Sequence, residues 1–313
     1  MDVQMQSDQT NRNQLGFSNI FAELWKFKFL VAGIFVITAL ISAYMALQMP
    51  NIYRTTTTLA PATEKKAGLG GLGSSLGGLA SLAGVNLSGA GAVDKTDLAI
   101  ELLKSKAFLA RFIESQGLLL PLLAAKSWDL NSGLYIYDPE IYDETTKTWV
   151  RNAIAPRKAE PTSFEAAIRF AELLEINKDK TTSIVKLNFE HLSPNDVQKW
   201  TSGLVDAVNN EIRTRDIQEA KSSLEYLNKQ LQESQVSEIR SSLVQLIEDQ
   251  TKTLMLANIR DEYVFKVVDP AFVPDEKFKP RRSLVVLMSM FGVGIILMLI
   301  AYVRVLASAQ KSK

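Results

Sequence analysis

Two long runs of apolar residues, one near each end of the chain, constrain its fold more than any other feature. Phe29–Leu47 and Leu284–Val303 contain no charged residue. A helix rises about 1.5 Å per residue, so each run would form a helix roughly 28–30 Å long, which matches the hydrocarbon core of a bilayer. The sequence therefore predicts two membrane-spanning helices. Two spans place both ends of the chain on one side of the membrane and the segment between them on the other.

Charged residues beside the two runs favour termini that lie in the cytoplasm. The tails carry basic residues, namely Arg12, Lys26, Lys28, Arg304, Lys311 and Lys313. A second group flanks the other side of the second run, namely Lys277, Lys279, Arg281 and Arg282. The positive-inside bias is weak for long translocated segments, so we expect the tails to decide the orientation. The end of the first run lacks a small-x-small cleavage site, which predicts an anchor that is not removed.

The composition excludes several classes of protein. Lys+Arg total 35 against 34 Asp+Glu, a net charge of +1, so no basic surface of the kind that binds nucleic acid is expected. The chain has no cysteine, which excludes disulfides, thiolate metal sites and a cysteine nucleophile. The segment between the spans holds roughly 230 residues, enough for one sizeable core or two small ones.

Residue patterns between the spans predict a mixture of strands and helices. Strands are expected at residues 53–60, 183–189 and 263–268, which alternate or are rich in β-branched residues. Helices are expected at residues 94–116 and 161–177 because apolar residues recur at helical spacing. Residues 128–161 have the composition of an irregular loop, and residues 67–92 are dominated by Gly, Ser, Leu and Ala.

The longest helical pattern starts at Ser193, with Pro194 at the first helical position. A single rod from Pro194 to Asn258 would be roughly 98 Å long. The residues between its end and the second span reach at most about 90 Å when fully extended. The rod must therefore descend from a distal tip or fold into a hairpin near Ser234, and we favour the hairpin. In both arrangements the strands at 53–60 and 263–268 come close enough to pair in one sheet.

No residue pattern predicts an active site, a metal site or a cofactor site. Gly68–Gly73 satisfies G-x-G-x-x-G, but no buried strand precedes it and no helix start follows it. A phosphate-binding loop with its lysine is absent from the sequence. The single histidine, His191, has no cysteine partners for a zinc site, so we expect a surface or helix-capping role for it. The expected protein is not an enzyme.

Several residues near the second span are candidates for contacts with lipid or a partner. Prolines and arginines form a membrane-proximal motif of Pro270, Pro274, Pro280, Arg281 and Arg282. The arginines can anchor the chain at the interface through lipid headgroups, or they can contact an anionic lipid-linked substrate or partner. Gly292 and Gly294 have no side chains, so another membrane helix could approach the second span closely at these positions.

The long helix also carries an apolar stripe. Leu224, Leu227 and Leu231 are in register at helical spacing. A stripe of this kind needs a partner, and self-association around an axis normal to the membrane would supply one. We therefore predict a homo-oligomer.

In this order along one chain, the features resemble the Wzz-type chain-length determinants, also called polysaccharide co-polymerases. The resemblance rests on the two spans, the long helical segment and the membrane-proximal motif, and on three further stretches: Gly68–Gly91, Tyr135-Ile136-Tyr137-Asp138 with Trp149-Val150, and Leu256 to Pro270. The proline run before the second span is sparser here than in many relatives, which leaves the role of that segment open.

The resemblance implies a non-enzymatic regulator in the bacterial inner membrane that sets the modal length of O-antigen or a related polysaccharide. It implies an α+β membrane protein with a periplasmic α/β base, a long helical trunk and cytoplasmic termini. The implied partners are a Wzy-type polymerase, lipid-linked polysaccharide and further copies of the chain, about six to twelve in a ring. The expected segments are the tail 1–28, span 29–48, base 49–192, trunk 193–260, returning strand and Pro-rich basic segment 261–283, span 284–303 and tail 304–313.

Two other functions remain open from the sequence. One is a periplasmic adaptor of a capsule or exopolysaccharide exporter, and a related one is a partner of a separate tyrosine autokinase. A related branch of the family fuses such a kinase after the second span, whereas about ten residues follow Val303 here. A two-span sensor is disfavoured because its tails leave no room for an output domain.

Overall fold

The computed structural model describes residue 25, residues 27–62 and residues 95–311, with side chains described as far as Arg304. The Gly-rich segment at 67–92, with its G-x-G-x-x-G pattern, and most of the N-terminal tail lie outside these residues. The chain divides into two compact units. One contains residues 1–51 and 278–313, and the other contains Ile52–Lys277.

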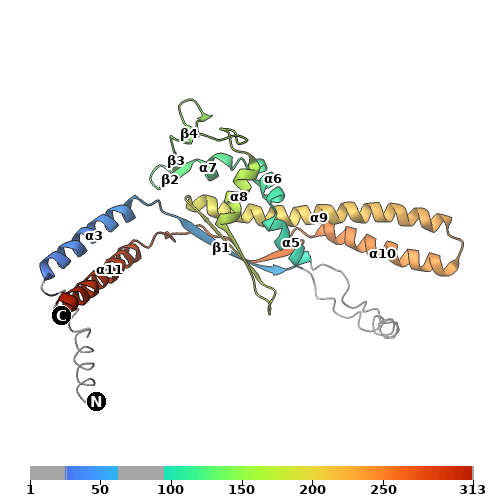
Figure 1. Cartoon of the computed structure of the whole chain (residues 1–313). Coiled ribbons are helices and arrows are strands. Elements are labelled where there is room, and N and C mark those ends of the chain that lie inside the picture. The colour runs from blue at the N-terminus through green and yellow to red at the C-terminus, as the bar shows by residue number, and fades with distance from the viewer. Residues whose placement is uncertain (1–24, 26, 63–94, 312–313) are drawn as a thin grey trace, which may run out of the picture. The chain divides into compact units, whose positions relative to one another are not determined.

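The first unit contains the two apolar helices (Figure 1). Helix α3 spans Lys28–Gln48 and helix α11 spans Arg282–Lys311, and the two pack against each other. Both are long and apolar enough to cross a membrane, over Lys28–Gln48 and Arg282–Arg304. Most of their large apolar side chains are exposed in the structure, and Ser42 and Ala46 are the buried residues of α3. Helices with apolar surfaces on nearly all sides fit a lipid environment, as the sequence predicts.

A four-stranded antiparallel sheet forms the centre of the second unit. Its order is β6-β7-β1-β8, with β1 at Tyr53–Pro61, β6 at Leu174–Lys178, β7 at Val185–His191 and β8 at Phe265–Asp269. Strand β1 pairs with β7 from Tyr53↔His191 to Leu59↔Val185, and with β8 from Thr58↔Asp269 to Pro61↔Phe265. The predicted pairing of the first and last strands in one sheet is therefore confirmed.

The alternation in β1 separates a buried face of the sheet from a polar one. Tyr53, Thr55, Thr57 and Leu59 are buried, while the residues between them are half-exposed. On the polar face Arg54 pairs with Glu190 of the neighbouring strand. The buried face is covered by helices, so this sheet has one side in the core and one side in water.

Four helices and the first half of a long hairpin cover the buried face. Helix α5 spans Lys95–Lys104, α6 spans Lys106–Gln116, α7 spans Leu119–Leu123 and α8 spans Ser163–Leu173. The core contains large side chains that are fully buried, among them Leu103, Leu109, Ile113, Phe170, Phe189, Leu204 and Phe265. Aromatic rings connect the layers, because Phe170 of α8 lies 4.6 Å from Phe189 of β7 between ring centroids.

Two predicted helices end earlier than the sequence suggests. The continuous helix expected at 94–116 is broken at Ser105, whose extended backbone and side chain cap the N-terminus of α6 by accepting a hydrogen bond from Phe108 N. The helix expected as far as residue 177 ends at Leu173, and Leu174–Lys178 forms strand β6 instead. The register Leu174↔Phe189 and Ile176↔Leu187 explains the second error, since pairing with β7 overrides the helical spacing.

The segment expected to be an irregular loop contains two small hairpins. Strands β2 (Ala125–Asp129) and β3 (Leu134–Tyr137) form one, and β4 (Tyr142–Asp143) and β5 (Thr148–Trp149) form the other. Aromatic side chains pair across the strands, as Trp128 does with Tyr135 and Tyr142 does with Trp149. These cross-strand pairs stabilise hairpins that are too short for the alternation rule to detect.

The long helical segment folds into a hairpin, as predicted (Figure 1). Helix α9 spans Pro194–Glu233 and helix α10 spans Ser237–Ile259, and they pack along each other. Ser193 caps α9 by accepting a hydrogen bond from Asp196 N at 3.2 Å. At the tip, Arg240 donates hydrogen bonds to the carbonyl oxygens of Leu231 and Ser234. Free carbonyls at the end of α9 are thereby satisfied across the turn.

Candidate functional site

The first part of the membrane-proximal motif is held against β1 by threonine side chains. Thr55 Oγ1 donates to Phe272 O at 2.8 Å and accepts from Phe272 N at 3.1 Å. Thr57 Oγ1 donates to Asp269 O at 2.8 Å. Pro270 is exposed and Pro274 is buried in this segment. Proline has no N–H that could donate to a neighbouring strand, so the backbone hydrogen bonds between β1 and β8 end at Asp269. From Asp269 onward, the hydroxyls of Thr55 and Thr57 hold this segment against β1.

The second part of the motif belongs to the other unit, with the apolar helices. Arg281 is exposed, and its carbonyl oxygen accepts the first hydrogen bonds of α11, from Leu284 N and Val285 N. Arg282 is half-buried and donates through Nη2 to Asn51 Oδ1 at 3.3 Å. Pro280 directly precedes these two arginines. The motif therefore divides between two units, and its role in lipid or partner contacts stays a prediction.

The two glycines of the second span have different surroundings. A Cβ at Gly294 would lie 3.6 Å from Phe35 Cζ of α3, whereas a Cβ at Gly292 would meet nothing within 4 Å. Gly294 therefore borders the contact between α3 and α11, and Gly292 faces away from it. Whether Gly292 packs against another membrane helix stays a prediction.

The leucine stripe lies on the part of α9 that α10 packs along. Leu224, Leu227 and Leu231 are half-buried, and Ala220 and Ala257, at the base of the hairpin, are fully buried. The sequence predicts that a second copy of the chain covers this leucine stripe, whereas α10 of the same chain already covers part of it. Other large side chains on the hairpin are exposed, among them Tyr226, Val244, Met255 and Ile259.

A buried polar cluster fastens the β2–β3 hairpin to the start of α9. The Tyr135 hydroxyl donates to the Asp196 carboxylate and lies 3.3 Å from His191 Nδ1. The His191 ring also packs on Trp200, with 4.6 Å between ring centroids. Burial and the bond to Asp196 raise the pKa of Tyr135. Its phenol therefore stays neutral and donates this hydrogen bond at neutral pH.

His191 is a core residue, so the expected surface position is wrong. Its side chain is 5% exposed at the end of β7. Burial lowers the pKa of His191 to about 4, although Asp196 acts in the opposite direction. The neutral imidazole is enclosed by Tyr135, Asp196 and Trp200. In the residues that the structure describes, no group of three or more His, Cys, Asp and Glu side chains could hold a metal ion.

A second polar cluster joins α5, α9 and the residues before β8. Lys95 Nζ donates to the Asp216 carboxylate and to the Tyr263 hydroxyl, which also donates to Asp216. Burial alone would lower the pKa of Lys95, but the bonds to Asp216 and Tyr263 outweigh burial and raise it. These three residues lie far apart in the sequence, so no local pattern predicts their contact.

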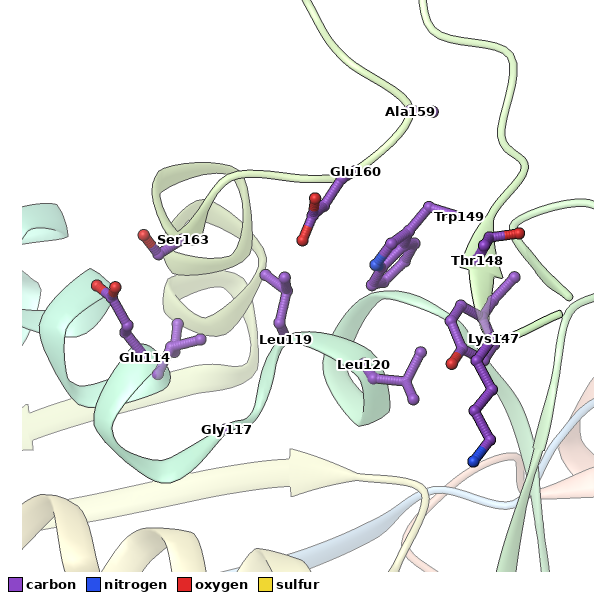
Figure 2. A pocket seen from close by; sticks show the side chains of 12 residues that line it. Glu114, Gly117, Leu119, Leu120, Lys147, Thr148, Trp149, Ala159, Glu160 and Ser163 are labelled. Carbon is purple, nitrogen blue, oxygen red and sulfur yellow. The ribbon is translucent and has the colours of Figure 1, made fainter. Parts of the chain in front are cut away.

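An open groove lies on the side of the second unit that carries the small hairpins (Figure 2). Its volume is about 780 Å³. One wall is the β4–β5 hairpin, and the other comes from α6, α7 and the start of α8. Side chains that line it include Glu114, Leu119, Leu120, Lys147, Trp149 and Glu160. Figure 2 labels Trp149, Glu160 and the two leucines among the side chains that line the groove. No sequence pattern predicts this groove, although Trp149-Val150 belongs to one of the stretches that carry the family resemblance.

The fold defines a class: an α+β protein in which residues 52–277 form one unit, and the segments before and after them in the sequence carry two helices that suit a bilayer. Residues 13–116 match the family model Wzz, described as chain length determinant protein. This match supports the resemblance to Wzz-type proteins that the sequence suggested, and with it a role in chain length determination in general. No curated protein matches the chain.

Two solved structures are similar to this chain. One is a full-length bacterial polysaccharide co-polymerase, with 12% identity and a TM-score of 0.36, covering 94% of this chain and 98% of that one. The other is a fragment of WzzB, a polysaccharide co-polymerase from Salmonella Typhimurium, with 11% identity and a TM-score of 0.30, covering 73% of this chain and 100% of that one. At these TM-scores the family match, and not the structural likeness, carries the assignment.

Proposed function

We propose that this protein sets the modal length of a polysaccharide, O-antigen of lipopolysaccharide or a related polymer, together with a Wzy-type polymerase. The observation that carries the proposal is the match of residues 13–116 to the chain length determinant family. The two apolar helices support it, because a regulator of polymer assembly on a lipid carrier works beside a membrane. The protein acts on the polymerase and its lipid-linked polysaccharide and performs no chemistry of its own.

The proposed location is the bacterial inner membrane, with both termini in the cytoplasm and the second unit in the periplasm. Helices α3 and α11 fit an inner membrane protein. The basic residues of the two tails support cytoplasmic termini. A reporter fused at the hairpin tip, near Ser234, should be active only as a periplasmic reporter, and activity of a cytoplasmic reporter there would contradict the proposal.

Wzz-type proteins act as oligomers in polysaccharide biosynthesis, and we expect a homo-oligomeric ring here. Exposed apolar residues on the α9–α10 hairpin support self-association, among them Val244, Met255 and Ile259. A double substitution Val244→Lys with Met255→Lys should reduce the particle mass of the full-length protein in detergent. Wild-type protein that behaves as a single protomer would contradict the ring.

Deletion of the gene tests the length-control function directly. We expect the lipopolysaccharide or exopolysaccharide ladder on a gel to lose its modal band, and the full-length gene to restore it. An unchanged ladder in the deletion strain would refute the assignment. Loss of polymer export with an unchanged length distribution would instead indicate the adaptor function.

A further inference from the structure

The open groove beside the β4–β5 hairpin has two walls that are each held in place by hydrogen bonds. The Asp143 carboxylate accepts from Thr145 N at 2.8 Å and from Thr146 Oγ1 at 2.9 Å, which fixes the turn of the hairpin. Arg151 donates to the carbonyl oxygens of Ala159 and Lys158 and pairs with Glu165 of α8 at 2.8 Å. The segment that carries Glu160 is thus fastened to α8. A groove with walls fixed in this way is formed before any ligand arrives.

The groove combines an aromatic ring with polar groups that are free to bind a ligand. Trp149 is half-buried and contacts Tyr142 edge to face, with 5.5 Å between ring centroids. In the part of the chain that the structure describes, the carboxylates of Glu114 and Glu160 make no hydrogen bond or ion pair. Thr148 and Ser163 add hydroxyl groups to the lining. The arrangement offers an apolar surface beside several acceptors and donors.

We infer that this groove binds uncharged sugar units of the polysaccharide whose length the protein controls. Pyranose rings present C–H faces that pack on an indole, and hydroxyl groups that donate to carboxylates. Glu160, which lines the same groove as Trp149, would accept from the hydroxyls of a sugar stacked on that ring (Figure 2). The inference rests on the proposed function and specifies where the body of the protein holds the polymer.

The charges of the groove favour a neutral ligand over an anionic one. Two carboxylates, Glu114 and Glu160, face one ammonium group, Lys147. Recognition of a phosphate or of a chain of uronic acids would require an excess of basic groups. The volume of about 780 Å³ lies within the range of sites that hold small ligands, and it suits a short stretch of an oligosaccharide rather than a single ion.

Binding is tested with the full-length protein in lipid nanodiscs. The probe is the polysaccharide that mild acid releases from its lipid in the source cells. Glu160→Gln keeps the shape of the side chain and should weaken binding about fivefold because a charged acceptor is lost. Trp149→Ala should weaken it about tenfold or more, and Trp149→Phe less. Glu140→Gln is the matched control, because Glu140 is exposed on the same segment but does not line the groove.

Each outcome decides the inference. Weaker binding in both groove variants, with Glu140→Gln unchanged and equal thermal unfolding in all Glu variants, would establish it. Absence of binding by the wild type, displacement of the polymer by inorganic phosphate, or equal binding in all variants would overturn it. So would a photo-crosslinker at position 149 that captures a second copy of this chain instead of the polymer.

The same variants separate this inference from the proposed function in cells. If the wild-type gene restores the modal length and the groove variants restore it equally, the groove inference fails while length control stands. If the wild-type gene itself does not alter the length distribution, the proposed function fails.

Discussion

Replacement of Asn209 tests how strongly a single buried amide joins α9 to strand β8. Asn209 is 4% exposed and makes three hydrogen bonds to the backbone of β8 and the residue before it. Its Oδ1 accepts from Val264 N at 3.0 Å and Phe265 N at 2.8 Å, and its Nδ2 donates to Phe265 O at 3.0 Å. Asn209→Ala would leave two N–H groups and one carbonyl without partners in a region where Val264 and Phe265 are buried.

The size of the effect follows from the cost of buried polar groups. Each group left without a partner costs about 1–3 kcal/mol, and water entering the space left by the side chain offsets part of the sum. We therefore expect a loss of about 3–5 kcal/mol in the free energy of unfolding. For a unit the size of Ile52–Lys277 this corresponds to a decrease in Tm of roughly 6–20 °C.

The measurement combines thermal unfolding of the full-length protein in detergent with hydrogen exchange of the amides at residues 264–269. Asn210→Ala is the matched control, because Asn210 is the next residue of α9 and its side chain is exposed. It accepts one hydrogen bond, from the Arg213 guanidinium. It should change Tm by about 1–2 °C at most. A similarly small change for Asn209→Ala, with unaltered exchange in β8, would refute the reasoning.

Three further predictions concern the other polar contacts. Because the pKa of His191 lies at about 4 in the folded protein and near 6.5 when unfolded, the unfolded chain binds the proton more readily. The free energy of unfolding should therefore fall by about 1.4 kcal/mol per pH unit as the pH drops from 6.5 to 4. His191→Phe should remove that part of the pH dependence. Identical pH profiles of Tm for the variant and the wild type would contradict this. Ser193→Ala should lower the free energy of unfolding by about 1 kcal/mol, measured by Tm, because α9 loses its N-cap; an unchanged Tm would show that Ser193 is dispensable. Lys95→Met should lower Tm at pH 7, and the difference from wild type should shrink as the pH rises above 10.5 through the raised pKa of Lys95, since the ammonium stabilises the fold only while it is charged. A difference that does not shrink at high pH would point to lost packing instead.

The sequence predicted those elements that depend on neighbouring residues. The apolar runs, the alternation of Tyr53–Pro61 and the Ser193-Pro194 helix start are all local signals, and the structure confirms them as α3, α11, β1 and the start of α9. Chain length left two arrangements of the long helical segment, a rod that descends from a distal tip or a hairpin, and the structure decides for the favoured hairpin. The break at Ser105 also has a local signal, a serine that caps α6, but the helical spacing on both sides of it predicts one helix. Local composition could not predict that α8 ends at Leu173, since pairing of the following residues with β7 decides this end.

The groove was the least predictable feature of the candidate site. Its walls come from three helices and a hairpin whose strands are two residues long. Alternation cannot be detected over two residues, so the sequence predicts an irregular loop for the whole of residues 128–161. The pairing of Tyr142 with Trp149, which shapes one wall, is visible only in the folded chain.

The sequence by itself determined two membrane-compatible helices, one near each end of the chain, and a mixture of strands and helices between them, because hydropathy and helical spacing are properties of consecutive residues. Only the tertiary structure decided the order β6-β7-β1-β8, the burial of His191, and the contacts of Asn209 and of Lys95 with Asp216 and Tyr263. The reason is that these features join residues far apart in the chain. Their stability comes from burying polar groups with partners that no local pattern specifies.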